Sequence, residues 1–121
     1  MDAEKSIVFD LDHTICFPHL DKMTTEERYG EAEPNREVIE YMRTLKELGF
    51  YITIHSSRRM ITHKGNLAAI NDDVYAVTAE WLRKYSVPFD RLVFGKPYST
   101  TWYVDDKAMT LEGLRDWMGD L

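Results

Sequence analysis

Short apolar runs alternate with longer amphipathic stretches along the chain, and this alternation limits the fold more than any other feature. The runs are rich in the β-branched and aromatic residues that strands favour, and they lie at residues 6–11, 50–57, 91–95 and 101–106. Apolar residues at helical spacing predict helices at residues 34–48, 73–85 and 110–118. Alternating strands and helices are typical of a parallel sheet covered by helices. We therefore expect an α/β, three-layer Rossmann-like fold with a central, mainly parallel sheet and helices on both faces.

The length and composition fit a single domain spanning residues 1–121. Residues 16–33 are mixed, with Pro18 and Gly30, and we expect a short flap there with a small hairpin. No apolar run approaches the roughly 18–20 residues of a membrane span, and nothing at the start reads as a signal peptide. The lone cysteine, Cys16, cannot form an internal disulfide and is expected to be a small packed residue. These features predict a cytoplasmic protein that does not bind membranes.

The formal net charge is −6, from 21 acidic and 15 basic residues. Nucleic-acid binding needs a basic face, so this balance makes nucleic acid an unexpected partner. An acidic chain can still bind an anionic substrate where a cation and local Lys or Arg side chains invert the field.

Polar side chains follow every predicted strand at its carboxyl end, which is where open α/β sheets bind ligands. In chain order these groups are Asp10–Leu11–Asp12, His55–Ser56–Ser57–Arg58, Gly95–Lys96 and Asp105–Asp106. Converging carboxylates cost several kcal/mol in a low-dielectric cleft unless a cation compensates them. Oxygen ligands suit Mg²⁺, whereas one cysteine and four histidines without ligand spacing argue against zinc. The pattern therefore predicts a Mg²⁺ site at this edge.

The segment DLDHT, residues 10–14, resembles the DxDx(T/V) signature of haloacid dehalogenase-like (HAD) hydrolases. A serine after an apolar strand, a lysine and an acidic pair follow in the order typical of that superfamily, and the resemblance covers residues 7–106. The segments SSRRM, FGKP and VDDKA further resemble small capsular-polysaccharide-biosynthesis phosphatases of this superfamily. Too few residues separate Asp12 from Ser56, or Ser56 from Lys96, for a folded cap domain. We therefore expect a capless HAD fold.

The resemblance implies a catalytic role for each matching residue. Asp10 would attack phosphorus and become an aspartyl-phosphate, and Asp12 would act as general acid and then as general base. Ser56 would donate a hydrogen bond to a phosphoryl oxygen, although Ser57 or His55 could take its place. Lys96 would neutralise the phosphoryl group.

The resemblance also implies the metal ligands. Mg²⁺ would be bound by Asp10, by the main-chain carbonyl of Asp12 and by Asp105. Asp106 would either hold a metal-bound water or orient Lys96. Together Mg²⁺ and Lys96 would screen the repulsion between an anionic nucleophile and a phosphate dianion.

Four residues are candidates for binding the rest of the substrate: His13, Ser57, Arg58 and Asn66. Arg58 is the best of them, because a guanidinium suits a second phosphate or a carboxylate, although a helix-capping or surface role is about equally expected. His13 replaces the commoner glycine, and we expect it mainly to support the turn. Trp81, Trp102 and Trp117 are expected to pack in or near the core.

The function predicted is a Mg²⁺-dependent phosphomonoester hydrolase, with a phosphorylated small molecule or saccharide, such as a polysaccharide precursor, as substrate. Three alternatives stay open. One is a non-catalytic HAD-like module that binds a phosphorylated partner, and another is a phosphatase acting on nucleotides or nucleic-acid ends. The third is a glycosyltransferase or nuclease that uses Asp10 and Asp12 only as a metal clamp. An open site could also be covered by a second subunit, so a homodimer is possible.

Overall fold

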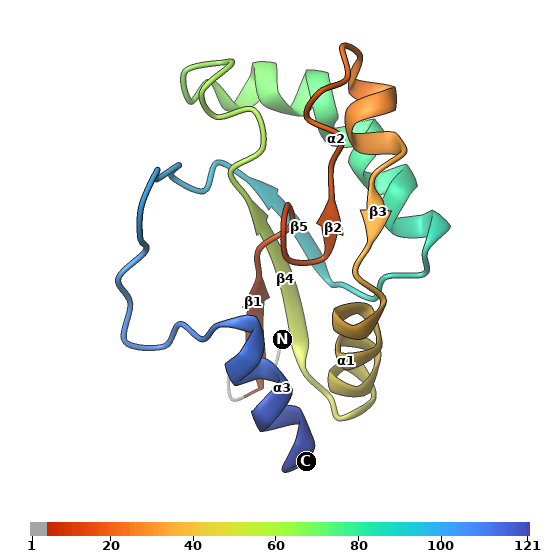
Figure 1. The fold of residues 1–121 in the computed structure, drawn as a ribbon, viewed down its shortest axis with the longest axis vertical. Helices are drawn as coiled ribbons and strands as arrows, with labels where there is room; N and C mark the ends of the chain where they lie inside the picture. Colours follow the sequence, from red (N-terminus) through yellow and green to blue (C-terminus); the bar gives the residue numbers. More distant parts are fainter. Residues whose placement is uncertain (1–4) are drawn as a thin grey trace.

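Three parallel strands form the central sheet of the molecule, in the order β1–β4–β5 (Figure 1). The computed structural model describes residues 5–121 and gives these strands as Ser6–Phe9 (β1), Tyr51–Ser56 (β4) and Arg91–Phe94 (β5). In the register, Val8 lies opposite Thr53 and Ile54 lies opposite Leu92. The predicted α/β fold with a parallel sheet is confirmed.

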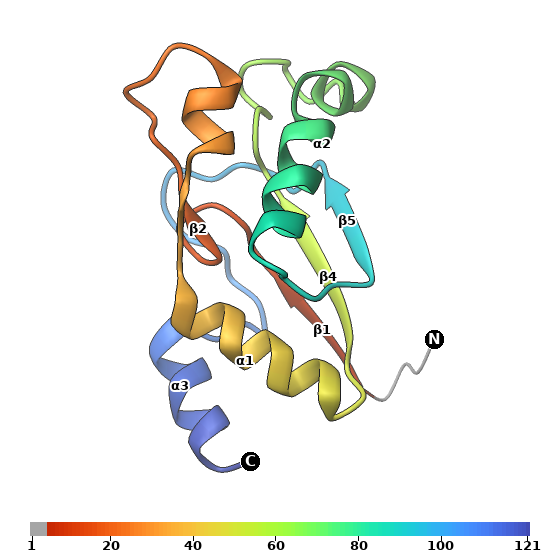
Figure 2. The same ribbon diagram turned by 90° about the vertical axis from the view of Figure 1, so that its right-hand side faces the viewer.

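Helices α1 (Arg36–Glu47) and α2 (Leu67–Lys84) lie together on one side of this sheet (Figure 2). Helix α3 (Leu111–Gly119) follows beside α1, where its Arg115 forms an ion pair with Glu37. Phe50 and Trp117 pack edge to face at 5.8 Å and join α3 to the start of β4. Helix α1 buries its apolar stripe in the main core, whereas Ile70 and Val74 of α2 pack with Phe94 at the carboxyl end of β5.

Alternate residues of the strands differ in exposure because the two faces of the sheet are covered unequally. Ile52 and Ile54 of β4 are fully buried in the main core, which also includes Met42 and Leu45 of α1. On the other face, Val8 of β1 is 64% exposed. The second face is thus only partly covered, and it borders the segment 97–110.

Helix α1 begins and ends close to the positions that its sequence predicts. The Asn35 side chain accepts a hydrogen bond from the Val38 amide at 3.3 Å, which satisfies one of the free N–H groups at the helix start. Gly49 follows the helix with φ +93°, a left-handed conformation that glycine adopts without steric cost.

The flap is an antiparallel pair of short strands with a helical turn between them. Strands β2 (Cys16–Phe17) and β3 (Glu33–Pro34) pair as the predicted hairpin, and the π-helix η1 (Glu26–Gly30) connects them. Tyr29 of η1 is buried and packs with residues of α2 and β5. This contact holds the flap against the body of the domain.

The prediction of a strand at residues 101–106 is wrong, because this segment is an exposed loop in the structure. Local hydrogen bonds replace a strand ladder: the Asp105 carboxylate accepts from the Lys107 amide at 2.8 Å, and the Tyr103 hydroxyl donates to the Pro97 carbonyl at 2.6 Å. Trp102 is 83% exposed, so its expected place in the core is also wrong.

Two further expectations concern the start of helix α2, which needs correction, and the burial of Trp81, which is confirmed. Helix α2 begins at Leu67 rather than at residue 73, since the Asn66 side chain caps it by accepting from the Ala69 amide at 3.1 Å. Trp81 is buried as expected, and its indole N–H donates to the Ala32 carbonyl at 2.9 Å. Over residues 5–121, every helix is too short or too polar to cross a membrane.

Candidate active site

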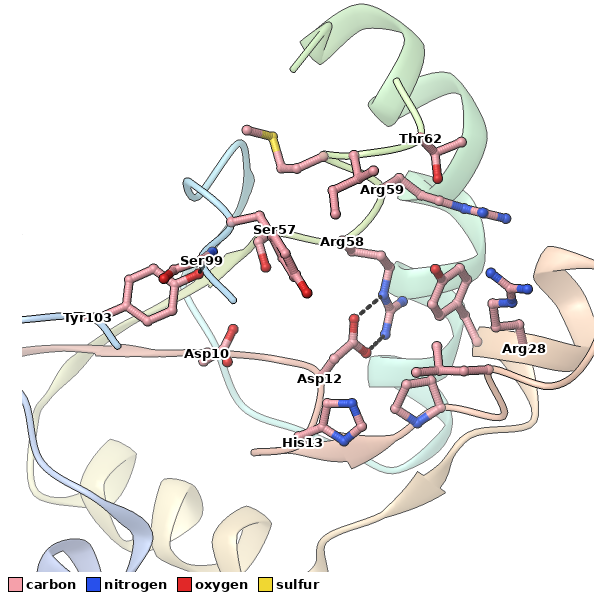
Figure 3. Close-up of a pocket in the computed structure, with 16 residues that line it drawn as sticks. Asp10, Asp12, His13, Arg28, Ser57, Arg58, Arg59, Thr62, Ser99 and Tyr103 are labelled. Atoms are coloured by element: carbon pink, nitrogen blue, oxygen red, sulfur yellow. Dashed lines mark hydrogen bonds and ion pairs between the residues drawn. The ribbon is translucent and has the colours of Figure 1, made fainter. Parts of the chain in front are cut away.

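A cavity of about 440 Å³ opens beside the carboxyl ends of β1 and β4 (Figure 3). Three segments form its walls: the β1 end with the flap, the loop after β4, and residues 98–103. Its size falls in the range of about 300–1,000 Å³ that is usual for small-molecule sites. The predicted location of the site at this edge of the sheet matches the position of the cavity.

Asp10 lies on this cavity, directly after β1, and Lys96 lies close to it. The Lys96 ammonium is 3.7 Å from an Asp10 carboxylate oxygen. The Lys96 amide donates to the Ser56 carbonyl at 3.1 Å, which extends the contact between β4 and β5 by one residue. The ammonium also lies 4.4 Å from the centre of the Tyr103 ring. The fold thus brings together a carboxylate and a lysine that are far apart in sequence.

Asp12 is held by Arg58 through both carboxylate oxygens (Figure 3). Arg58 Nε donates to Asp12 Oδ2 at 3.0 Å, and its Nη2 donates to Oδ1 at 2.5 Å. The Arg58 side chain is 2% exposed, and that of Asp12 is 22% exposed. Because paired, planar contacts of this kind fix both groups, Asp12 has a defined orientation at the cavity wall.

The remaining contacts of Arg58 are also with protein groups. Its Nη1 donates to the Thr78 hydroxyl at 2.8 Å, and its guanidinium lies 4.1 Å from the centre of the Tyr29 ring. Burial lowers the pKa of Arg58, but the hydrogen bonds and charge of Asp12 more than offset this, so its pKa is raised. Arg58 is therefore a charged group whose guanidinium is bonded to Asp12 and Thr78.

Cys16 lies behind this ion pair, within 3.4 Å of an Asp12 oxygen. Burial raises the pKa of its thiol well above the ordinary value, and the Asp12 carboxylate adds to this effect. Since the thiolate is the reactive form, Cys16 is an inert packing residue, as the sequence predicts.

The two candidate serines differ in access to the cavity. Ser56 is 1% exposed, and its hydroxyl accepts a hydrogen bond from the Arg58 amide at 3.0 Å. Ser57 lines the cavity. Burial lowers the pKa of His55, and the charge of Lys96 lowers it further.

His13 lines the cavity, whereas Asn66 does not. His13 has φ 65°, in the left-handed region, and its amide donates to the Cys16 carbonyl at 2.7 Å, which closes the turn after Asp12. This contact matches the turn-supporting role expected for it. Asn66 is used as the cap of α2 instead.

Asp105 and Asp106 lie apart from the other candidate ligands. Both are in the exposed loop, and neither lines the cavity. The pKa of Asp105 is lowered mainly by the hydrogen bond from the Lys107 amide, and to a smaller extent by a hydrogen bond with Asp106. Within residues 5–121, no group of three or more His, Cys, Asp or Glu side chains is arranged to hold a metal ion.

The cavity also contains residues that sequence reasoning missed. Arg28, Tyr98, Ser99 and Tyr103 all line it, and so does Arg59. No motif marks these positions. Their approach depends on how the flap and the segment after Lys96 fold, so the sequence alone carries no signal for them.

Comparison with known proteins gives three structural relatives. No family model and no curated protein matches the chain. A crystal structure of a target protein from Vibrio cholerae is 32% identical, with a TM-score of 0.76, over 96% of this chain and 98% of that one.

Two structures of a Pnkp1/Rnl/Hen1 complex, one of them described as an RNA repair complex, share the fold at 16% and 17% identity. Their TM-scores are 0.54 and 0.55, and the matches cover 96% and 98% of this chain but 33% of each of theirs. At that identity they show the fold alone. The Vibrio cholerae relative, by contrast, matches from end to end, and the chain belongs to the same family as that protein.

Proposed function

We propose that this protein is a phosphomonoester hydrolase of the HAD type, with Asp10 as nucleophile. The observation that carries the proposal is the position of Asp10 at the end of β1, on a cavity, with the Lys96 ammonium 3.7 Å from its carboxylate. A phosphoryl group that enters beside Asp10 meets a carboxylate able to attack phosphorus and a cation able to offset the added negative charge.

Other residues of the cavity supply the remaining steps. Asp12 would protonate the leaving oxygen and later take a proton from the water that hydrolyses the aspartyl-phosphate, which requires one of its oxygens to leave the Arg58 guanidinium. Ser57, which reaches the cavity, is better placed than the buried Ser56 to donate a hydrogen bond to a phosphoryl oxygen.

We also propose that activity requires Mg²⁺, although the described residues do not form a complete site for it. Asp10 and the main-chain carbonyl of Asp12 are at the cavity, but Asp105 and Asp106 lie in the exposed loop. Two oxygen ligands leave the ion bound mostly by water.

The substrate proposed is a phosphorylated small molecule or saccharide, which the cavity volume can accommodate. The likeness to chains from an RNA repair complex favours a second candidate, a phosphatase acting on nucleic-acid ends. Turnover of a 3′- or 5′-phosphorylated oligonucleotide, compared with that of sugar phosphates, separates the two candidates.

The nucleophile can be tested directly. Beryllium fluoride with Mg²⁺ should form a phosphate mimic on Asp10, visible by ¹⁹F NMR, and p-nitrophenyl phosphate should be hydrolysed. Asp10→Asn should abolish both signals, whereas Asp116→Asn, on the exposed side of α3, should keep both. A variant Asp10→Asn with undiminished turnover would exclude this function.

A further inference from the structure

The charges that line the cavity do not balance. Among residues 5–121, Asp10 and Asp12 are the only carboxylates that line it, and each has its own cation: Lys96 for Asp10 and Arg58 for Asp12. Two further arginines, Arg28 and Arg59, also line the cavity. In a chain whose formal net charge is −6, this wall carries an excess of positive charge.

Arg59 is held in this wall at a conformational cost. Its φ is 64°, in the left-handed region that L-residues other than glycine seldom adopt, and such strain tends to occur at functional positions. Its Nε is buried without a hydrogen bond. The nearest carboxylate oxygen, Asp73 Oδ2, is 3.2 Å away but pairs with His63 at 2.8 Å. Arg59 therefore forms an ion pair with Asp73 through Nε, and within residues 5–121 its two terminal nitrogens donate no hydrogen bond.

Arg28 is positioned by the flap and has no acidic partner. Its Nε and Nη2 donate to the Lys22 carbonyl at 3.2 and 2.9 Å, which fixes the guanidinium without neutralising it. In the part of the chain that the structure describes, no carboxylate forms an ion pair with Arg28. Figure 3 shows both Arg28 and Arg59 beyond Arg58, away from Asp10.

We propose that Arg28 and Arg59 form a subsite for a second anionic group of the substrate, a phosphate or a carboxylate. This proposal rests on the proposed function, because it places the scissile phosphoryl group at Asp10. The buried ring of Tyr29 supports the subsite, since the Arg59 guanidinium lies 5.4 Å from its centre. Guanidinium groups suit both anions because they donate paired, charge-assisted hydrogen bonds. The substrate class is then a phosphomonoester that carries a second acidic group besides the scissile phosphate.

Binding to the Asp10→Asn protein, which cannot turn over, tests the subsite by calorimetry. Three probes share one phosphoryl group and differ at the other end of the sugar: glucose 6-phosphate, 6-phosphogluconate and glucose 1,6-bisphosphate. We expect the two probes with a second anion to bind about 10-fold tighter than glucose 6-phosphate or more, equivalent to about 1.4 kcal/mol. Tighter binding of 6-phosphogluconate would identify the second anion as a carboxylate, and tighter binding of glucose 1,6-bisphosphate would identify it as a phosphate.

Arg28→Gln and Arg59→Gln should each remove most of that preference. Arg83→Gln, which removes an exposed arginine paired with Glu80 on α2, should leave it unchanged. Equal binding of the three probes, or a preference that survives both substitutions, overturns the subsite. Turnover of p-nitrophenyl phosphate, which has no second anion, tests the proposed function separately, so the two failures are distinguishable.

Discussion

Replacing Arg58 by Met should destabilise the protein strongly, because the arginine joins three buried or half-buried groups. The change retains a long apolar side chain but removes every hydrogen bond of the guanidinium. Asp12 then loses both guanidinium donors, at 3.0 and 2.5 Å, and the Thr78 hydroxyl loses its donor at 2.8 Å. The contact with the Tyr29 ring also disappears.

The magnitude follows from the burial of the groups left behind. Removing one partner of a buried ion pair costs about 3–5 kcal/mol, since the remaining charge is left uncompensated. Water reaches Asp12 in part, because its side chain is 22% exposed, and this reduces the cost. Thr78 is 1% exposed and cannot be rehydrated in place. We expect a loss of about 3 kcal/mol in the free energy of unfolding.

Urea unfolding followed by circular dichroism and by the fluorescence of the buried Trp81 measures this loss. A double-mutant cycle with Asp12→Ala isolates the pairwise part. Once Asp12 is gone, Arg58→Met no longer leaves an unpaired carboxylate, so its cost should fall by about 1–2 kcal/mol. Arg115→Met, which breaks an exposed ion pair with Glu37, is the matched control and should cost below about 1 kcal/mol.

Two results would refute this reasoning. One is a loss below about 1 kcal/mol in Arg58→Met, a value typical of a surface ion pair. The other is additivity of the two substitutions within about 0.5 kcal/mol, which is the behaviour of independent sites. Either result would mean that Arg58 does not hold Asp12 in solution.

Three further predictions concern the scaffold. Trp81→Phe leaves the Ala32 carbonyl without its donor and should lower the free energy of unfolding by about 2 kcal/mol in urea. Asn35→Ala removes the cap of α1 and should cost about 1–2 kcal/mol in the same assay, with Asn35→Ser recovering part of the loss. The hydrogen bond from Lys46 lowers the pKa of Asp90. The ionised Asp90 carboxylate therefore contributes fully to the free energy of unfolding above about pH 4, and this contribution is lost as the pH falls through the pKa of Asp90 in the folded protein. Asp90→Asn should then lessen the acid dependence of the melting temperature.

The sequence predicts the part of the site that rests on strand ends. A buried apolar run places the residues at its end at the carboxyl edge of a parallel sheet, so Asp10 could be assigned to this edge from its place near the end of the predicted strand at residues 6–11. Lys96 follows β5 by the same logic, and the structure brings it to Asp10. These positions depend on local strand formation, which the sequence encodes.

The strand predicted at residues 101–106 does not form, because a strand depends on more than its local sequence. Its Trp, Tyr and Val residues favour a strand, but a strand exists only when a neighbour pairs with it. In the structure the Asp105 side chain and the Tyr103 hydroxyl satisfy local groups instead. Pairing at the sheet edge is a tertiary choice, so residue preference could not decide it. Because this strand does not form, the expected ligands Asp105 and Asp106 lie in the exposed loop.

The arginines show a second limit of sequence reasoning. Arg58 and Arg59 are adjacent and identical in type, yet one guanidinium is buried on Asp12 and the other faces the cavity with a strained backbone. Both guanidinium groups favour anionic partners, and the two arginines differ only in the groups that the fold places beside them. Because Asp12 accepts from Nε and Nη2 of Arg58 and Thr78 accepts from its Nη1, the anion subsite that we propose uses Arg28 and Arg59 instead. The same ion pair that fixes the proposed acid–base residue thus decides which arginines remain available to the substrate.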